Sequence, residues 1–241
     1  MRIRIENVGN GEIIPHAILL IRGWVDCHVP NVEQIPLYVE QESETNKTVK
    51  IILLTNKRFK FATRLEKGGN QFRFQFLNCY EVLDVTYLRR SDSSNKIRLV
   101  YVTNADEPKG CFQVPKTTTK ELHYQSSIES ARKRISLAGE LIQCFMSDSL
   151  RAHQLEPRKS IIFHSDQSES PSVCVFESRL TGGDTRSLQG EELWNRIGKE
   201  LIETNIANED TKCIAILAAT RLVVIQKHFE RGPGFISLIP R

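Results

Sequence analysis

The stretch Lys67-Gly68-Gly69-Asn70-Gln71-Phe72-Arg73-Phe74-Gln75-Phe76 carries the clearest fold signal in this sequence. Its three phenylalanines alternate with polar residues, so they fall on one face of a pleated strand. The preceding residues 67–70 are rich in Gly and Asn, which accept positive φ, and they predict a turn. Because an apolar pattern also precedes this turn, we predict a hairpin between residues 58–65 and 70–78.

Short apolar segments separated by turns continue on both sides of this hairpin, up to about Pro115. About seven antiparallel strands in a hundred residues are typical of an immunoglobulin-like β-sandwich. We therefore predict a sandwich domain over residues 1–115. The strand segments are Arg2–Val8, Ala17–Trp24, Val49–Leu54, Arg58–Leu65, Asn70–Asn78, Val82–Leu88 and Ile97–Thr103.

The pattern changes after Pro115. Ser126-Ser127-Ile128-Glu129 matches a capping box, and apolar residues then recur every three or four positions up to Met146, which predicts a long helix over 126–150 with one buried stripe. A second helix is predicted over Glu191–Asn205. With strands at Ser160–His164, Ser172–Phe176 and Lys212–Leu217, residues 116–241 are predicted to form an α/β or α+β domain. The chain as a whole is predicted to be an α+β multidomain protein.

The composition indicates which partners and which cellular compartments we expect for this protein. The chain has 33 basic and 29 acidic residues and a net charge of +4, so no broad basic face for nucleic acid is implied. The N-terminus lacks the apolar core of a signal peptide, and no apolar run is long enough to span a membrane. We expect a cytoplasmic or nuclear protein without membrane contact. The six cysteines are spread singly, which argues against a disulfide scaffold or a zinc finger and predicts reduced thiols.

The sequence contains no metal-binding motif. There is no H-E-x-x-H, and no two of the six histidines share one helix face at close spacing. Cys27 and His28 would point to opposite sides of a strand, so we interpret them as a buried thiol and a partly exposed imidazole. His164 ends a predicted strand before a loop, where a histidine with a structural hydrogen bond is the commoner case.

Nucleophile and phosphate motifs are missing as well. No G-x-S-x-G elbow and no protease-type cysteine context occur. We interpret Thr181-Gly182-Gly183-Asp184 and Arg231-Gly232-Pro233-Gly234 as turns, because neither has the length and lysine of a phosphate loop. Arg89-Arg90 and Arg132-Lys133-Arg134 are interpreted as solvated basic faces, with RNA binding as a weaker alternative. No catalytic, cofactor-binding or metal-ligating residue is therefore assigned.

The order of segments resembles the N-terminal part of a family of zinc metallopeptidase-like proteins of fungi and animals. The resemblance covers about residues 1–220 and rests on several elements in order. They are Asn10–Ile14, Ala17–Gly23, Phe61 with Leu65, Lys67–Phe74, Leu99–Val102, Ser130–Phe145, Arg158–Phe163 and Thr211–Leu217. In that family, a β-sandwich precedes a protease-like domain.

The resemblance implies that residues 116–241 are a partial zincin-like α/β domain. The family's zinc-binding H-E-x-x-H helix would follow later, and His228 lacks the Glu and second His of that motif. By this resemblance the chain is the non-catalytic portion of a zinc-dependent peptidase, with no cofactor of its own and zinc expected only in a longer family member. The alternative from a different class is a protein- or glycan-interaction module without enzymatic activity, with a protein or peptide as partner; the sequence leaves the oligomeric state open.

Overall fold

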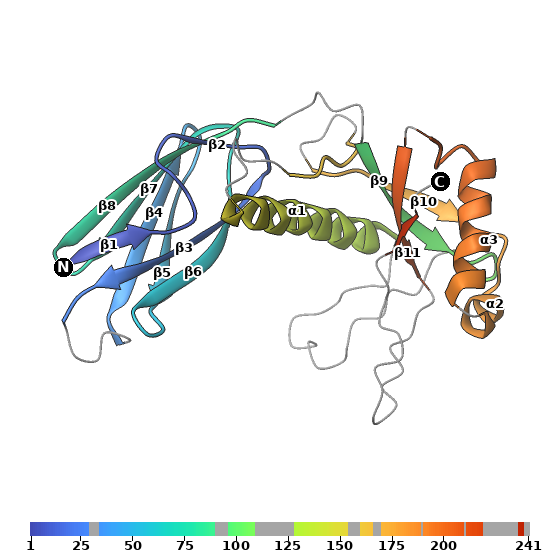
Figure 1. Cartoon of the computed structure of the whole chain (residues 1–241), viewed down its shortest axis with the longest axis horizontal. Coiled ribbons are helices and arrows are strands. Elements are labelled where there is room, and N and C mark those ends of the chain that lie inside the picture. Colours follow the sequence, from blue (N-terminus) through green and yellow to red (C-terminus); the bar gives the residue numbers. More distant parts are fainter. Residues whose placement is uncertain are drawn as a thin grey trace. The chain divides into compact units, whose positions relative to one another are not determined.

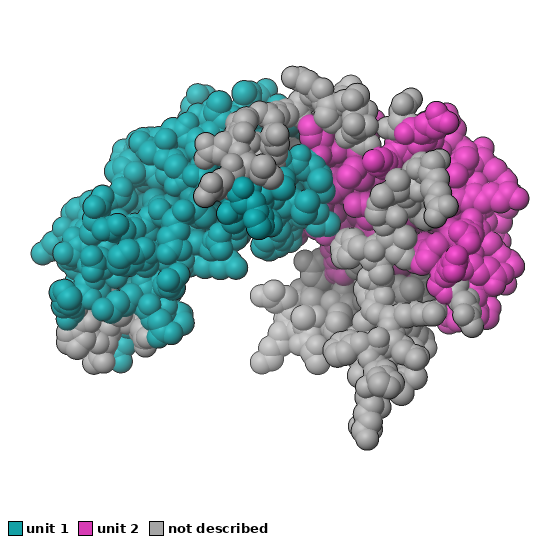
Figure 2. Space-filling model, in the orientation of Figure 1, with its two compact units in different colours: residues 1–91, 140–161 teal, residues 92–139, 162–241 magenta. Residues whose placement is uncertain are grey.

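The computed structural model describes residues 1–28, 34–89, 96–108, 128–153, 160–165, 170–188, 190–209, 211–218 and 236–238, without the side chains of Lys96 and 236–238. The described part is a mixed α+β structure with three helices and several β-sheets (Figure 1). The chain divides into two compact units (Figure 2). Unit 1 comprises residues 1–91 and 140–161, and unit 2 comprises residues 92–139 and 162–241.

Unit 1 contains two sheets. The first has the order β1-β3-β6, and the second has the order β2-β8-β7-β4-β5. Strand β2 runs parallel to β8, and all the other pairs in these two sheets are antiparallel, so the prediction of antiparallel strands alone was wrong for β2. Strands β2 and β4 were not predicted. The bounds are β1 (Arg2–Ile5), β2 (Glu12–Ile14), β3 (Ile18–Asp26), β4 (Pro36–Ser43), β5 (Lys47–Leu53), β6 (Arg58–Arg64), β7 (Gly68–Phe76) and β8 (Cys79–Tyr87).

One apolar core lies between these two sheets. Phe72, Phe74 and Phe76 on β7 are fully buried, and the residues between them are exposed, which confirms the predicted alternation. Phe59 on β6 packs against Phe74 with ring centroids 5.8 Å apart. Because β6 and β7 belong to different sheets, this contact joins the two layers.

The predicted hairpin between residues 58–65 and 70–78 was wrong. Strand β6 pairs with β3, whereas β7 pairs with β4 and β8, so the chain crosses from one sheet to the other between them. The side-chain amide of Asn70 stabilises the connection between β6 and β7. It donates to the carbonyl oxygens of Glu66 (2.7 Å) and Gly68 (3.1 Å) and accepts from the Glu66 amide (3.0 Å). Gly68 adopts φ +92°, a conformation that favours glycine.

Unit 2 is built on a sheet of order β10-β9-β11-β12. Strands β10 (Val173–Glu177) and β11 (Thr211–Leu217) run parallel to β9 (Lys96–Thr103) on its two sides, and β12 (Ile236–Leu238) is antiparallel to β11. Strand β9 was expected among the sandwich strands, and that assignment was wrong. Its apolar run is buried on both faces, as in the middle of a parallel sheet, and this pattern does not reveal its partners.

Helices cover both faces of this sheet. Helix α3 (Gly190–Glu203) agrees with its prediction and packs Ile197 and Leu201 against Val100 and Val102 of β9. On the other face, Leu99 lies under Gly139 of helix α1 (Ile128–Ala152), and a Cβ at Gly139 would come within 2.8 Å of it. Residues 160–164 were predicted as a strand, but within the described residues they form only one bridge to β9.

Helix α1 was predicted at nearly its observed bounds. Its predicted apolar stripe is buried at Ala131 and Ile135, but not at the C-terminal end of the helix. Phe145 and Met146 were expected on the buried stripe and are 53% and 42% exposed. Glu140, Cys144 and Ser147 are buried in their place. Cys144 packs against Ile18 and Leu20 of β3, and Glu140 is buried through an ion pair, so polar contacts shift the buried face away from the apolar stripe.

Candidate functional site

The described cysteines are free thiols, and Cys174 lies near Cys213 in the core of unit 2. Cys27 is buried and His28 is exposed, as predicted, although both residues lie just beyond the end of β3 at Asp26. The backbone of His164 donates to Ile97 and accepts from Ser172, which gives this residue a structural role. Among the described residues, no group of three or more His, Cys, Asp or Glu side chains is placed to hold a metal ion. His123, His228 and Cys111 lie outside the described residues.

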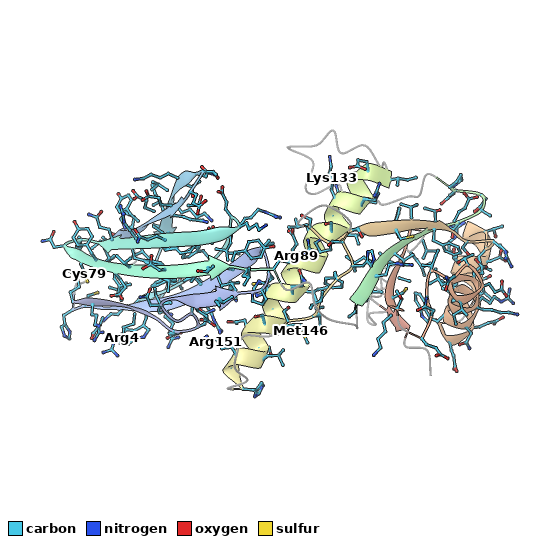
Figure 3. The ribbon with its side chains drawn as sticks, turned by 90° about the horizontal axis from the view of Figure 1, so that it is seen from above. Arg4, Cys79, Arg89, Lys133, Met146 and Arg151 are labelled. Atoms are coloured by element: carbon cyan, nitrogen blue, oxygen red, sulfur yellow. The ribbon has the colours of Figure 1, made fainter. Side chains whose placement is uncertain are left out.

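The remaining sequence candidates are structural where they are described. Thr181 and Asp184 form a capping box at the start of a short helix, α2 (Gly182–Ser187), which corrects the prediction of a turn there. On α1, Arg132 and Lys133 are exposed and pair only loosely with Glu129, at 3.8 and 3.7 Å. Lys133 of α1 and Arg89 are both labelled in Figure 3; Arg89 and Arg134 are partly buried, so the prediction of a solvated basic face is confirmed for Arg132 and Lys133 alone. Arg90 and residues 231–234 lie outside the described residues.

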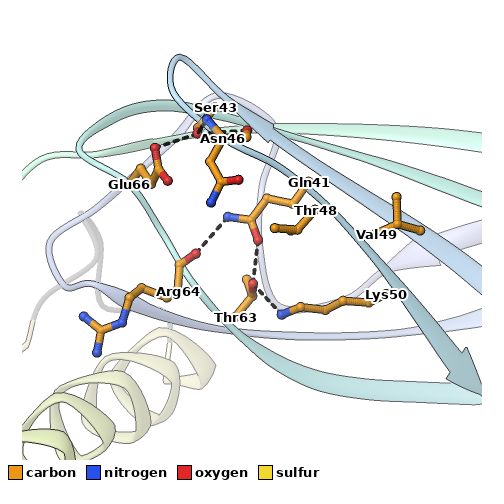
Figure 4. Close-up of a pocket in the computed structure, with 9 residues that line it drawn as sticks. All are labelled: Gln41, Ser43, Asn46, Thr48, Val49, Lys50, Thr63, Arg64 and Glu66. Atoms are coloured by element: carbon orange, nitrogen blue, oxygen red, sulfur yellow. Dashed lines mark hydrogen bonds between the residues drawn. The ribbon is translucent and has the colours of Figure 1, made fainter.

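A cavity of about 310 Å³ opens in unit 1 between the edges of its two sheets. Among the described strands, β5 is the last strand of one sheet and β6 the last strand of the other, so both walls are strand edges. Side chains from β4, β5 and β6 and from their connections line it (Figure 4). The lining residues are Gln41, Ser43, Asn46, Thr48, Val49, Lys50, Thr63, Arg64 and Glu66.

A chain of hydrogen bonds crosses this cavity from strand to strand. Lys50 Nζ donates to Thr63 Oγ1 (2.7 Å) and to the Ala62 carbonyl oxygen (3.2 Å). Thr63 Oγ1 donates to Gln41 Oε1 (2.6 Å), and Gln41 Nε2 donates to the Arg64 carbonyl oxygen (2.8 Å). Carbonyl groups on β6 thus receive side-chain donors in the cavity, where a further strand would otherwise bond them.

The two ends of the cavity differ in charge (Figure 4). Glu66 lies at one end and accepts hydrogen bonds from Thr45 and Ser43, which hold the pKa of its carboxyl below its usual range. Lys50 lies at the other end, where burial lowers the pKa of its ammonium group. Within the described residues, no carboxylate lies within 4 Å of Lys50 Nζ, so only neutral oxygens and the ring of Phe61, 5.7 Å away, stabilise this cation.

The arginine in the cavity wall is already paired. Arg64 makes a two-pronged hydrogen-bonded ion pair with Glu140 of α1, through Nη1 to Oε1 (3.0 Å) and through Nη2 to Oε2. Glu140 is almost completely buried, so its carboxylate holds the guanidinium in place. Lys50 is therefore the cation of this cavity that is available to an incoming anion.

An apolar surface borders the cavity on the outer face of the same sheet. On β5, Val49, Ile51 and Leu53 are 60%, 66% and 67% exposed. Tyr38 of β4 lies directly opposite Ile51 and is also exposed. We call these four residues the edge patch. Three large apolar side chains at alternate positions on one face of an edge strand are unusual, because an exposed apolar edge strand can pair with a strand of another chain.

Sequence reasoning found part of this site and missed the rest. Residues 49–54 were predicted as a strand, but β4 was not predicted, so the position of β5 at a sheet edge could not be recognised. Lys50 interrupts the apolar run of β5, and a lysine within such a run is a common feature of edge strands that could have identified it.

The fold and the site describe a two-unit α+β protein with a pocket at the sheet edges of unit 1. Residues 2–229 match the Metallopep family, whose description is "Putative peptidase family". The match covers nearly the whole chain, and the chain belongs to this family. No curated protein matches the chain. In the described part of the chain, no helix is long and apolar enough to cross a membrane.

Proposed function

We propose that unit 1 is a protein-interaction module of a peptidase-family protein. The observation that carries this proposal is the edge patch, which exposes three apolar side chains on a strand that pairs with β4 alone among the described strands. Contiguous exposed apolar surface rimmed by polar groups marks binding surfaces in soluble proteins. The cavity beside the patch adds polar groups that can select among partners.

The strand order of unit 1 supports an immunoglobulin-like arrangement for this module. In immunoglobulin domains, the first, second and fifth strands share one sheet, and the last two lie beside the third. If β1 and β2 are counted together as the first strand, divided between the two sheets, then β3 is the second strand, β4 the third and β6 the fifth. The orders β1-β3-β6 and β8-β7-β4-β5 then agree with that arrangement. For unit 2 we propose a zincin-like α/β arrangement, supported by three parallel strands with helices on both faces.

The role of these 241 residues within the family is the second part of the proposal. We propose that the family's activity is zinc-dependent peptide hydrolysis and that this chain contributes a non-catalytic portion, with zinc bound in longer members. The lack of an H-E-x-x-H motif in the sequence supports this view. Zinc titration by calorimetry and a peptide cleavage assay on the same preparation test it. Stoichiometric zinc binding together with hydrolysis by residues 1–241 would overturn this part.

The interaction role has a separate test. A random peptide library displayed on phage is selected on the wild-type chain and, in parallel, on the Ile51→Lys variant, whose circular dichroism confirms that it is folded. Enriched sequences that bind the wild type and lose binding to the variant support the role. A library that yields no enriched sequence, or sequences indifferent to the variant, refutes it.

A further inference from the structure

The cavity and the edge patch share the edge strand β5. Successive side chains of a strand point to opposite faces of a sheet. Val49, Ile51 and Leu53 therefore lie on the outer face, and Lys50 lies on the inner face between them, toward the cavity. A strand added along β5 would have the same alternation, with one set of side chains on the edge patch and the other directed into the cavity.

Among the described strands, β5 is hydrogen-bonded on one side only, and β6 of the other sheet lies near its second edge. On one side β5 pairs with β4 from Lys47 to Leu53, and on the other side no described strand pairs with it. The cavity lies along this second side, with Thr48, Val49 and Lys50 in its wall. Its volume of about 310 Å³ is at the lower end of the range for small-molecule sites, so it can accept one or two side chains of a bound peptide.

The positive charge of Lys50 favours an acidic side chain of the peptide in the cavity. Lys50 is partly desolvated and has only neutral oxygens within hydrogen-bond distance among the described residues. A desolvated ammonium gains more from a carboxylate than from neutral acceptors. The carboxylate of Glu66 is held at the other end of the cavity by Thr45 and Ser43, so it does not serve Lys50.

We propose that unit 1 binds an extended peptide segment along the free edge of β5, with an acidic side chain of the peptide paired to Lys50 in the cavity and apolar side chains on the edge patch. This inference rests on the proposed interaction role and names its partner class. A second copy of this chain fits less well. In an antiparallel β5 pair with Lys50 opposite Lys50 the two ammonium groups repel, and in the register centred on Ile51 each Lys50 faces Ile52, so no acidic side chain reaches either cavity.

The test measures peptide binding to the full chain by fluorescence anisotropy. Three labelled peptides alternate valine with threonine and carry glutamate, glutamine or lysine at the central threonine position. The proteins are the wild type, Lys50→Gln, Lys50→Glu and Lys60→Gln, the last being a matched control because Lys60 is exposed on the neighbouring strand β6. Circular dichroism melts confirm that each variant is folded.

The wild type is expected to bind the glutamate peptide at least about tenfold more tightly than the glutamine peptide. Lys50→Gln should remove this preference, Lys50→Glu should transfer it to the lysine peptide, and Lys60→Gln should leave it unchanged. Hydrogen exchange should slow at the amides of β5 when the glutamate peptide binds. Equal binding of the glutamate and glutamine peptides by the wild type, or protection confined to other strands, would overturn the inference.

Two further outcomes separate this inference from the proposed role. If Ile51→Lys abolishes binding of the library peptides but Lys50→Gln leaves their affinity unchanged, the interaction role is supported. The inference that an acidic side chain pairs with Lys50 is then wrong. A concentration-dependent dimer in sedimentation analysis that Ile51→Lys abolishes would make a second copy the occupant, and would overturn the peptide assignment.

Discussion

Replacing Arg64 with alanine is expected to destabilise unit 1 far more than replacing a comparable arginine on the same strand. Arg64 makes the two-pronged pair with Glu140, whose side chain is only 2% exposed, while its own is 54% exposed. Removing the guanidinium leaves a buried carboxylate without its cation, a loss that costs about 3 to 5 kcal/mol for fully buried pairs. Because Arg64 is half exposed, water can reach part of the vacated space, and we expect about 2 to 3 kcal/mol.

Arg58 provides the matched control. It lies at the other end of β6 and pairs with Glu6 at 3.4 Å, with both side chains exposed. Exposed pairs contribute less than about 1 kcal/mol, so Arg58→Ala should have little effect. The double variant Arg64→Ala with Glu140→Gln should recover part of the lost stability, because an uncharged amide is less costly to bury than an unpaired carboxylate.

Urea unfolding followed by tryptophan fluorescence measures these differences. The chain has two tryptophans, Trp24 in unit 1 and Trp194 in unit 2, so a Trp194→Phe background reports on unit 1 alone. The midpoint of unfolding should fall in Arg64→Ala at an unchanged slope. If Arg64→Ala and Arg58→Ala shift the midpoint equally, the reasoning from burial of the carboxylate is refuted.

Three further substitutions or measurements test local features. Gly23→Ala should destabilise unit 1 by about 3 kcal/mol in the same assay, because the new Cβ would clash with the Arg4 carbonyl oxygen and with the Phe59 ring. Gly69→Ala, with nothing within 4 Å of the new Cβ, should be nearly neutral. Leu77 adopts φ 52° in the β7–β8 turn, a conformation that glycine adopts at lower cost. Leu77→Gly should therefore raise the free energy of unfolding by about 0.5 to 1 kcal/mol and increase the melting temperature. An unchanged or lower melting temperature would contradict the claim of strain. Burial raises the pKa of the Cys213 thiol to about 11 from 9.0. Because the folded state keeps this proton while the unfolded state loses it, the stability of unit 2 should fall between pH 9 and 11, and a Cys213→Ala variant should show a smaller decrease in urea titrations at these pH values.

Side-chain alternation was sufficient to predict elements, but it was not sufficient to predict pairing. The buried face of Phe72, Phe74 and Phe76 and the extent of α3 follow from local periodicity, which the chain shows without reference to distant residues. The partners of β6 and β7 depend on which sheet each strand joins. Both strands bury aromatic residues in the same core, so their patterns look alike from opposite sheets.

The candidate site could not be predicted from the sequence either, because it depends on which strands lie beside one another. Lys50, Thr63 and Gln41 come from three strands, one of which, β4, was not predicted. Strand β4 begins at Pro36 and carries acidic residues on its outer face, features that weaken a strand prediction. Likewise Glu140 is charged and buried, and only its contact with an arginine 76 residues away explains its place on the inner side of α1.

The pairing of β9 has a consequence for the order in which the protein is made. Strand β9 lies between β10 and β11, and its residue Leu99 pairs with Val173 on one side and with Ile214 on the other. At about 5 to 20 residues per second, a ribosome takes roughly 4 to 15 s to make the chain from Leu99 to Val173, and longer to reach β11. Throughout that interval both edges of a strongly apolar strand have no native partner, so the nascent chain is most exposed to misassociation, and most in need of a chaperone, while residues 104–172 are being synthesised.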